Sequence, residues 1–186
     1  MAEAPTKAEL LEALRTTGDR TVAKLRALPP ADLESGRYEG GWNGREILAH
    51  VAAIEWTYAR LIEVARQAPS EPVAADAPSA VRRTTPEETP GVPTRTARGG
   101  IDDYNARQVE KRASATVAEL LDEFAANRAK TIAAVEATDE SLLATPIRSA
   151  GGITGQLASV IMAVAVQHVM MHVADITGEP WREQRW

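Results

Sequence analysis

The chain has 186 residues, which is enough for one domain with a substantial hydrophobic core. Its 21 basic and 26 acidic residues give a net charge of −5, which argues against nucleic acid and anionic membranes as main partners. The absence of cysteine excludes disulfides, thiolate metal ligands and a cysteine nucleophile. Residues 1–7 lack the layout of a signal peptide, and the apolar stretch 160–166 is too short and too polar at its end to span a bilayer. We therefore expect a soluble cytoplasmic protein.

Four long segments repeat apolar residues at helical spacing, and together they predict an all-α fold. The predicted helices cover residues 6–28, 43–67, 114–137 and 154–177, and residues 102–112 form a helix of their own or extend the third one backwards. The first three helices have a capping residue followed three positions later by glutamate, namely Thr6 with Glu9, Asn43 with Glu46 and Thr116 with Glu119. No strand is expected, and residues 1–186 are predicted to form a single domain.

The connection between the second and third helices, residues 68–102, is long and rich in proline. Its prolines predict that most of it has no regular structure. It is long enough to cross the length of a bundle, so the second and third helices can run parallel. Two interpretations stay open, a disordered surface loop or a lid or wall of a substrate pocket. The arginines of this connection either meet a carboxylate ligand or stay solvated, and they are Arg82, Arg83, Arg95 and Arg98.

The chain has three histidines, His50, His168 and His172, and they are its most informative residues. His168 and His172 are four residues apart on the last predicted helix, so both rings lie on one face. All three fall on the inward apolar stripe of their helix, where a buried imidazole needs a partner. One interpretation is a metal site with two ligands from one helix, one from another and an open fourth position. The other is three core histidines satisfied by hydrogen bonds.

Two motifs resemble those of the DinB/YfiT-like four-helix bundle superfamily. The first is the segment GWNGREILAHV at residues 41–51, in which a tryptophan precedes a helix start and a histidine follows a hydrophobic run. The second is the spaced histidine pair on the last helix. Residues Asp103, Tyr104 and Asn105, ahead of the third helix, also resemble a segment that many members carry. In these respects the chain is similar to the N-terminal domains of mycothiol-dependent maleylpyruvate isomerases and to bacillithiol S-transferases.

This resemblance implies a four-helix bundle with an up-down-down-up course and a long crossover between the second and third helices. It also implies one divalent metal ion, zinc or nickel, held by His50, His168 and His172. Characterised members add a low-molecular-weight thiol, such as mycothiol or bacillithiol, to an electrophile, or isomerise a substrate through a thiol adduct. We therefore expect a metal-dependent thiol S-transferase whose partners are a small thiol and an electrophile, with Asn105 in contact with the thiol. A homodimer is a further expectation.

The chemistry agrees with this ligand set. A free thiol has a pKa of about 8.5, and coordination to a cation deprotonates it, so a site with an open position can present a thiolate to an electrophile. The same site can instead activate water for hydrolysis, although the HExxH motif of metalloproteases is absent. An alternative from another class is a non-enzymatic bundle that binds a metal or a small ligand in a stress response.

Several residues near the expected site have two interpretations. Glu46 either caps its helix or orients a ligand imidazole, and Asp175 either orients an imidazole or lies in solvent at the last helical turn. Trp42 either packs at the helix entry or forms a wall of the pocket. Trp181 and Trp186 either fold back over the bundle or contact a second subunit.

Overall fold

Reciprocal caps fix where the long helices begin in the computed structural model, which describes residues 4–35, 41–67 and 80–180. Helices α1 (Lys7–Arg26), α3 (Gly44–Glu55) and α6 (Val117–Glu136) each follow a capping side chain that accepts a hydrogen bond from the backbone N–H three residues later. In return, a glutamate carboxylate accepts the N–H of the capping residue, so two unpaired backbone donors are satisfied. The three predicted capping boxes are confirmed, and Glu46 is the cap of α3.

The prediction of one continuous helix over residues 43–67 is wrong at its centre. Helix α3 ends at Glu55, and α4 (Ala59–Arg66) begins after a short interruption. The backbone N–H and the hydroxyl of Thr57 both donate to the Ile54 carbonyl, at 2.9 and 2.6 Å. This tighter bonding pattern interrupts the α-helical series of hydrogen bonds.

The last long helix begins later than predicted and is not α-helical throughout. Residues 154–156 belong to a strand, β3 (Ile153–Gln156), and the helix starts after it with α8 (Leu157–Ile161). A π-helical segment, η1 (Met162–Gln167), then leads into α9 (His168–Thr177). The glycine pair before β3 belongs to a turn between two strands, and Gly152 has a φ of 83°, which glycine adopts without strain.

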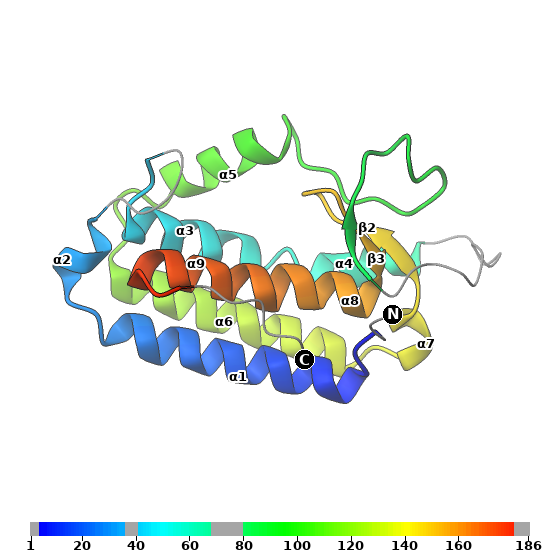
Figure 1. Ribbon diagram of the computed structural model, residues 1–186, viewed down its shortest axis with the longest axis horizontal. Coiled ribbons are helices and arrows are strands. Elements are labelled where there is room, and N and C mark those ends of the chain that lie inside the picture. Colours follow the sequence, from blue (N-terminus) through cyan, green and yellow to red (C-terminus); the bar gives the residue numbers. More distant parts are fainter. Residues whose placement is uncertain (1–3, 36–40, 68–79, 181–186) are drawn as a thin grey trace.

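A small antiparallel sheet lies at one end of the helices (Figure 1), so the prediction that the chain has no strand is wrong. Its strands are β1 (Arg82–Arg83), β2 (Pro146–Arg148) and β3, in the order β1-β3-β2. Strand β1 lies in the proline-rich connection, within a stretch that has no proline between positions 78 and 86. The connection therefore has a two-residue strand there, which agrees with the prediction that most of it, rather than all of it, lacks regular structure. Residues 68–79 lie outside the described residues.

Hydrogen bonds hold the rest of the connection against this sheet. The Arg148 guanidinium donates to the Thr84 carbonyl from Nε and Nη2, at 3.0 and 2.7 Å. The hydroxyl oxygens of Thr84 and Thr154 are 2.6 Å apart. The backbone N–H of Arg95 donates to the Arg148 carbonyl at 3.0 Å. The connection is thus attached at two places, around Thr84 and around Arg95.

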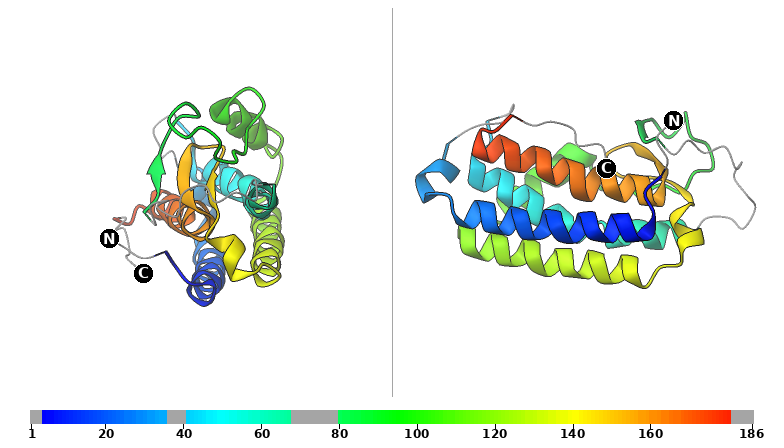
Figure 2. Two further views of the ribbon diagram at one scale, coloured as in Figure 1. Left: turned by 90° about the vertical axis from the view of Figure 1, so that its right-hand side faces the viewer. Right: turned by 60° about the horizontal axis from the view of Figure 1, so that its bottom comes forward.

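The long helical segments lie side by side and enclose the core (Figures 1 and 2). Helix α6 packs against α3 and α1, and α9 packs against α1 and α3. Helix α5 (Ile101–Glu110) is a separate helix that packs on α3, and α2 (Pro30–Leu33) and α7 (Glu140–Leu143) are short connecting turns. The prediction of a helical protein is confirmed, with the small sheet as an addition.

One helical stretch of the described residues, Leu157–Thr177, is long and apolar enough to cross a membrane by length and composition alone. The prediction that this region is too short and too polar therefore does not hold by those two criteria. In the folded protein, however, 61% of its most apolar window is buried, and the stretch packs against α1 and α3. The core helix of a soluble protein has the same properties.

An ion pair is buried among the helices, and the sequence analysis did not identify it. Arg128 Nε lies 2.8 Å from Glu55 Oε1, and the two side chains are 4% and 0% exposed. Arg128 also donates to the carbonyl oxygens of Leu14, at 3.2 Å, and Ala165, at 2.6 Å. Burial raises the pKa of Glu55 to about 7, against the opposing effect of Arg128.

We expect Arg128→Met to lower the free energy of unfolding by about 3–5 kcal/mol at pH 8, because it leaves a buried carboxylate without its partner. The loss should be smaller at pH 5, where Glu55 can take up a proton. Urea unfolding at both pH values measures the difference, with Arg60→Met as the control because Arg60 pairs with Glu63 on the surface. A loss that is the same at both pH values would contradict this account of the pair.

Candidate metal centre

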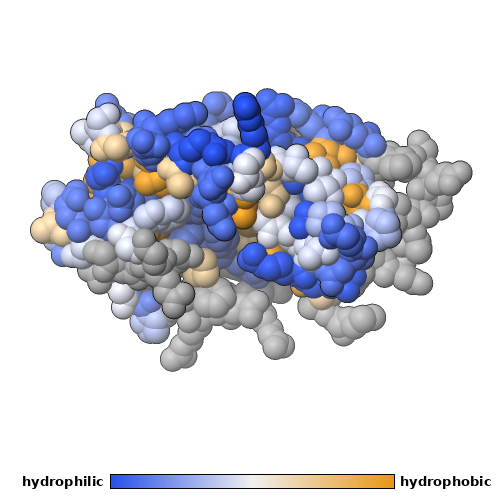
Figure 3. Space-filling model, turned by 90° about the horizontal axis from the view of Figure 1, so that it is seen from above, coloured by the Kyte–Doolittle hydropathy of each residue, from blue (hydrophilic) through white to orange (hydrophobic). Residues whose placement is uncertain are grey.

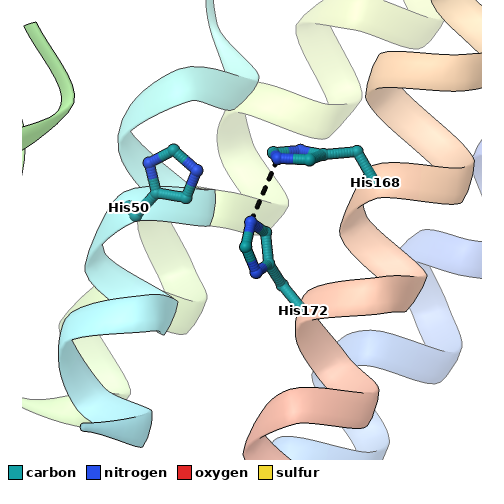
Figure 4. A group of neighbouring side chains, drawn as sticks. All are labelled: His50, His168 and His172. Carbon is teal, nitrogen blue, oxygen red and sulfur yellow. Dashed lines mark hydrogen bonds between the residues drawn. The ribbon is translucent and has the colours of Figure 1, made fainter. Parts of the chain in front are cut away.

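Three imidazoles from two neighbouring helices converge inside the molecule (Figure 4). His50 projects from α3, and His168 and His172 project from α9. One ring nitrogen from each histidine lies within 4.8 Å of the others. The Nε2 atoms of His168 and His172 are 3.0 Å apart. Two nitrogen ligands of one zinc ion, each about 2.0–2.1 Å from it, are separated by roughly this distance.

The surroundings keep all three rings neutral. Burial lowers the pKa of His50 to about 3, with a contribution from His168. Burial, His172 and the Arg83 guanidinium lower the pKa of His168 to about 3, and burial together with His50 does the same for His172. A neutral imidazole has a free lone pair, which is the form that binds a metal.

Hydrogen bonds between described residues do not fully satisfy these rings. The Nδ1 atoms of His50 and His168 are buried and have no hydrogen-bond partner within residues 4–35, 41–67 and 80–180. The interpretation as satisfied core histidines therefore fits poorly, because a buried polar atom without a partner is costly. The cluster can hold a metal ion by its geometry and its chemistry.

Asp175 orients one of the imidazoles. Its Oδ2 lies 3.1 Å from Nδ1 of His172. When the neutral ring carries its proton on Nδ1, it donates to this carboxylate, and Nε2 then carries the lone pair of the ring. Trp42 lies next to the cluster, with its ring centroid 5.2 Å from that of His50. It therefore forms a wall of the site as well as packing at the start of α3.

The π-helical segment η1 changes which face of the last helix carries the histidines. A π-turn adds a residue to the turn and rotates everything after it around the helix axis. Beyond η1, Val169 and Ile176 are the residues that pack in the core. Val164, His168 and Met171 instead line a pocket. Of the predicted inward stripe, Leu157, Ile161 and His172 are buried as predicted, whereas Val164 and His168 are partly exposed and line this pocket.

A pocket of about 820 Å³ opens beside the histidines, a size that suits a small organic molecule. Val81, Arg83 and Arg95 of the connection line it, as the pocket-wall interpretation expects. Its other polar lining residues come from the link between α3 and α4, from α5, from the β2–β3 turn and from η1. They include Thr57, Tyr58, Asp102, Tyr104, Asn105, Ser149 and Gln167. Figure 3 looks onto the side of α5 and the connection, where most surface residues are hydrophilic and a few hydrophobic ones show between them.

The structure brings the residues that the sequence singled out into this one region. Asn105 lies on α5 and lines the pocket, and its Oδ1 is buried without a hydrogen-bond partner among the described residues. Of the four arginines of the connection, Arg83 and Arg95 line the pocket. Tyr58, which the sequence does not mark as a site residue, also lines the pocket, and its hydroxyl is buried without a hydrogen-bond partner among the described residues. Trp181 and Trp186 lie outside the described residues.

These observations define a class of protein, namely a helical domain in which three histidines from two helices meet at a pocket. Residues 13–176 match the family model of the DinB superfamily. The chain belongs to that superfamily, as the two sequence motifs predicted. A search of curated proteins found no match to this chain.

Two solved structures share the fold. They are the mycothiol-dependent maleylpyruvate isomerase and a variant of it in which one histidine is replaced by alanine. The identities are 18% and 17%, and the TM-score is 0.64 for both. Each alignment covers 95% of this chain and 63% of the isomerase chain, so the present chain spans less than two thirds of that protein. At such identities the likeness shows a common fold alone.

We expect the metal-free protein to lose stability as the pH falls from 6.5. The unfolded chain takes up protons on histidine near pH 6.5, whereas the folded chain resists protonation down to about pH 3. The loss is about 1.4 kcal/mol per pH unit for each buried histidine that titrates in this way. Urea unfolding between pH 6.5 and 5 measures the slope. His50→Leu should make the slope of the unfolding free energy against pH shallower by about 1.4 kcal/mol per pH unit, the contribution of one histidine. An unchanged slope would contradict the assignment of a neutral His50.

Proposed function

We propose that this chain is a metal-dependent enzyme that transfers a low-molecular-weight thiol, of the mycothiol or bacillithiol type, to an electrophile. The observation that carries the proposal is the convergence of three neutral imidazoles at the edge of an 820 Å³ pocket. The fold shared with the mycothiol-dependent isomerase supports it. The chain has no cysteine, so a thiol nucleophile has to come from a cosubstrate.

His50, His168 and His172 are the proposed ligands of one divalent ion, zinc or nickel. Neutral nitrogen ligands suit both metals, and three of them leave a position open. When bound, such an ion lowers the pKa of a thiol, so the nucleophilic thiolate is available at neutral pH.

Several residues of this chain have different roles around the open coordination position of the metal. Asp175 holds His172 in one tautomer, and Trp42 shields His50 from solvent. Ile54, Val164 and Met171 are apolar lining residues that exclude water from the reacting groups. Asn105 has a buried side-chain oxygen without a described partner, and we propose that it accepts a hydrogen bond from the thiol cosubstrate.

We further propose that the four long helical segments form the up-down-down-up bundle of the family. In Figure 1, α1 and α9 run in one direction along the molecule, while α3 and α6 run in the other. The parallel pair α3 and α6 is joined by the long connection, which supports the crossover. A cytoplasmic location and a homodimer are also proposed, and size-exclusion chromatography with light scattering tests the dimer.

The metal assignment predicts about one divalent ion per chain in the purified protein, measured by elemental analysis. His168→Ala should abolish metal binding, yet the protein should stay helical and unfold cooperatively because its apolar core does not involve the site. Gln167→Ala is the matched control, since Gln167 lines the same pocket next to His168. A full complement of metal in the His168→Ala variant would contradict the assignment.

The reaction assignment predicts activity with a small thiol that persists at pH values well below the pKa of the free thiol, about 8.5. His50→Ala should remove this activity, because the lowered thiol pKa depends on the bound ion. Initial rates across a panel of thiols and electrophiles, measured from pH 5.5 to 9, provide the test.

A protein with metal in place and no rate above the uncatalysed one for any pair would support the alternative instead. In that case the chain is a non-enzymatic bundle that binds a metal or a small ligand. The pocket volume supports a small ligand in either case.

A further inference from the structure

The register of the small sheet selects one of two adjacent arginines for the pocket. Neighbouring residues of a strand point to opposite faces. In β1, Arg82 pairs with Thr154 and Arg83 pairs with Ile153, and Arg83 is the one that lines the pocket. The backbone N–H of Thr84 donates to the Gly152 carbonyl at 2.8 Å, which holds the strand in this position.

A second arginine reaches the same pocket from the other attachment point of the connection. The backbone of Arg95 is bonded to Arg148, as described above, and its guanidinium lies over the Trp56 ring, 5.9 Å from the centroid. The Arg60 guanidinium lies 5.6 Å from the same ring. Cation–π contacts of this kind fix the direction of a long side chain. Arg95 is therefore held at the pocket and is not simply a solvated surface residue.

Neither arginine forms an ion pair with an acidic residue that the structure describes. The ion pairs found among the described residues involve other basic groups. One acidic residue, Asp102, is among the described lining residues, so the arginines outnumber the acids there two to one. A pocket whose cations are left unpaired favours an anionic ligand.

Tyr58 adds a neutral hydroxyl donor to the residues that line this pocket. Tyr58 is 5% exposed and lines the pocket, and its Oη has no hydrogen-bond partner in the part of the chain that the structure describes. Burial and the nearby Glu55 raise the pKa of this hydroxyl well above its usual value, despite the charges of Arg128 and Arg95. The hydroxyl therefore keeps its proton and needs an acceptor.

We propose that Arg83, Arg95 and Tyr58 form a carboxylate-binding subsite, and that the small-molecule ligand of this protein is an organic acid. A carboxylate offers two oxygens that match the fork of a guanidinium and accept from a hydroxyl. The subsite and the three histidines line one pocket, so a single ligand can contact both. This inference deepens the proposed function by naming the class of ligand, whose carboxylate belongs either to the thiol or to the electrophile.

The first experiment measures binding of succinate and of its neutral analogue succinamide to the full chain by ligand-observed NMR. It is done without added metal, because succinate is itself a metal ligand and because the result then does not depend on the proposed reaction. We expect succinate to bind at least roughly tenfold more tightly than succinamide, the factor that one charge-assisted hydrogen bond contributes. Arg83→Gln and Arg95→Gln should each remove most of that preference.

Arg82→Gln and Arg98→Gln are the matched controls, because they remove the same charge from the same connection at positions that do not line the pocket. They should leave succinate binding within about twofold of the original value. The subsite is overturned if succinamide binds as well as succinate, or if the control variants weaken binding as much as the pocket variants. Arg83→Lys and Arg95→Lys, which keep the charge, should retain part of the preference and cover the case in which a glutamine variant does not fold.

The second experiment identifies which partner carries the carboxylate. The cobalt-loaded protein is titrated with 3-mercaptopropionate and 3-mercaptopropionamide, and the sulfur-to-cobalt absorption reports thiol binding. A roughly tenfold preference for the acid that Arg83→Gln removes assigns the carboxylate to the thiol. Equal binding of the two thiols, with succinate still bound in their presence, assigns it to the electrophile. A failure to load cobalt would contradict the metal proposal and leave the succinate result unaffected.

Discussion

The buried ion pair between Glu55 and Arg128 is the interaction on which the arrangement of the helices depends. A guanidinium inside a protein needs an acceptor for each donor that water no longer satisfies. Here the acceptors come from three further helices, through Leu14 on α1, Glu55 on α3 and Ala165 on η1. A shift of any one helix along its axis would break one of these bonds. The pair therefore fixes the axial alignment of the helices, which apolar packing alone determines less strictly.

This alignment also determines whether a metal site can exist. Glu55 follows His50 by five residues on α3, about 7.5 Å along the axis, and Ala165 precedes His168 by three residues. The ion pair thus holds α3 and the last helix together close to the points from which the histidines project. The π-helical segment adds the second requirement, because it turns His168 towards the pocket while Val169 stays in the core. A site that needs several side chains positioned to within about an ångström depends on such support.

Features that depend on a few neighbouring residues could be predicted from the sequence, whereas features that depend on contacts between distant residues could not. The three capping boxes need only four consecutive residues, and they were found correctly. The histidine cluster could be inferred because three rare residues fell on apolar stripes. Arg128 could not, because arginine is rarely buried even where it falls on an inward stripe, and its burial here depends on Gly18. A Cβ at Gly18 would lie 3.1 Å from Arg128 Cγ, so glycine there leaves the room that the arginine needs. Strand β1 was missed for a similar reason, because it pairs with β3, about seventy residues away in the sequence.

Two groups of pocket-lining residues, the histidines and the arginines, are supported in physically different ways. The histidines project from long helices whose positions are fixed by the core and by the buried ion pair. Arg83 and Arg95 come from the connection, which a two-residue strand and a few hydrogen bonds attach to the sheet. Changes in the connection can alter the charge and shape of the pocket mouth with little effect on the helices, since the buried core does not depend on them. On the proposed function, the helices position the ligands of the metal, and the connection selects the small molecule that the pocket binds.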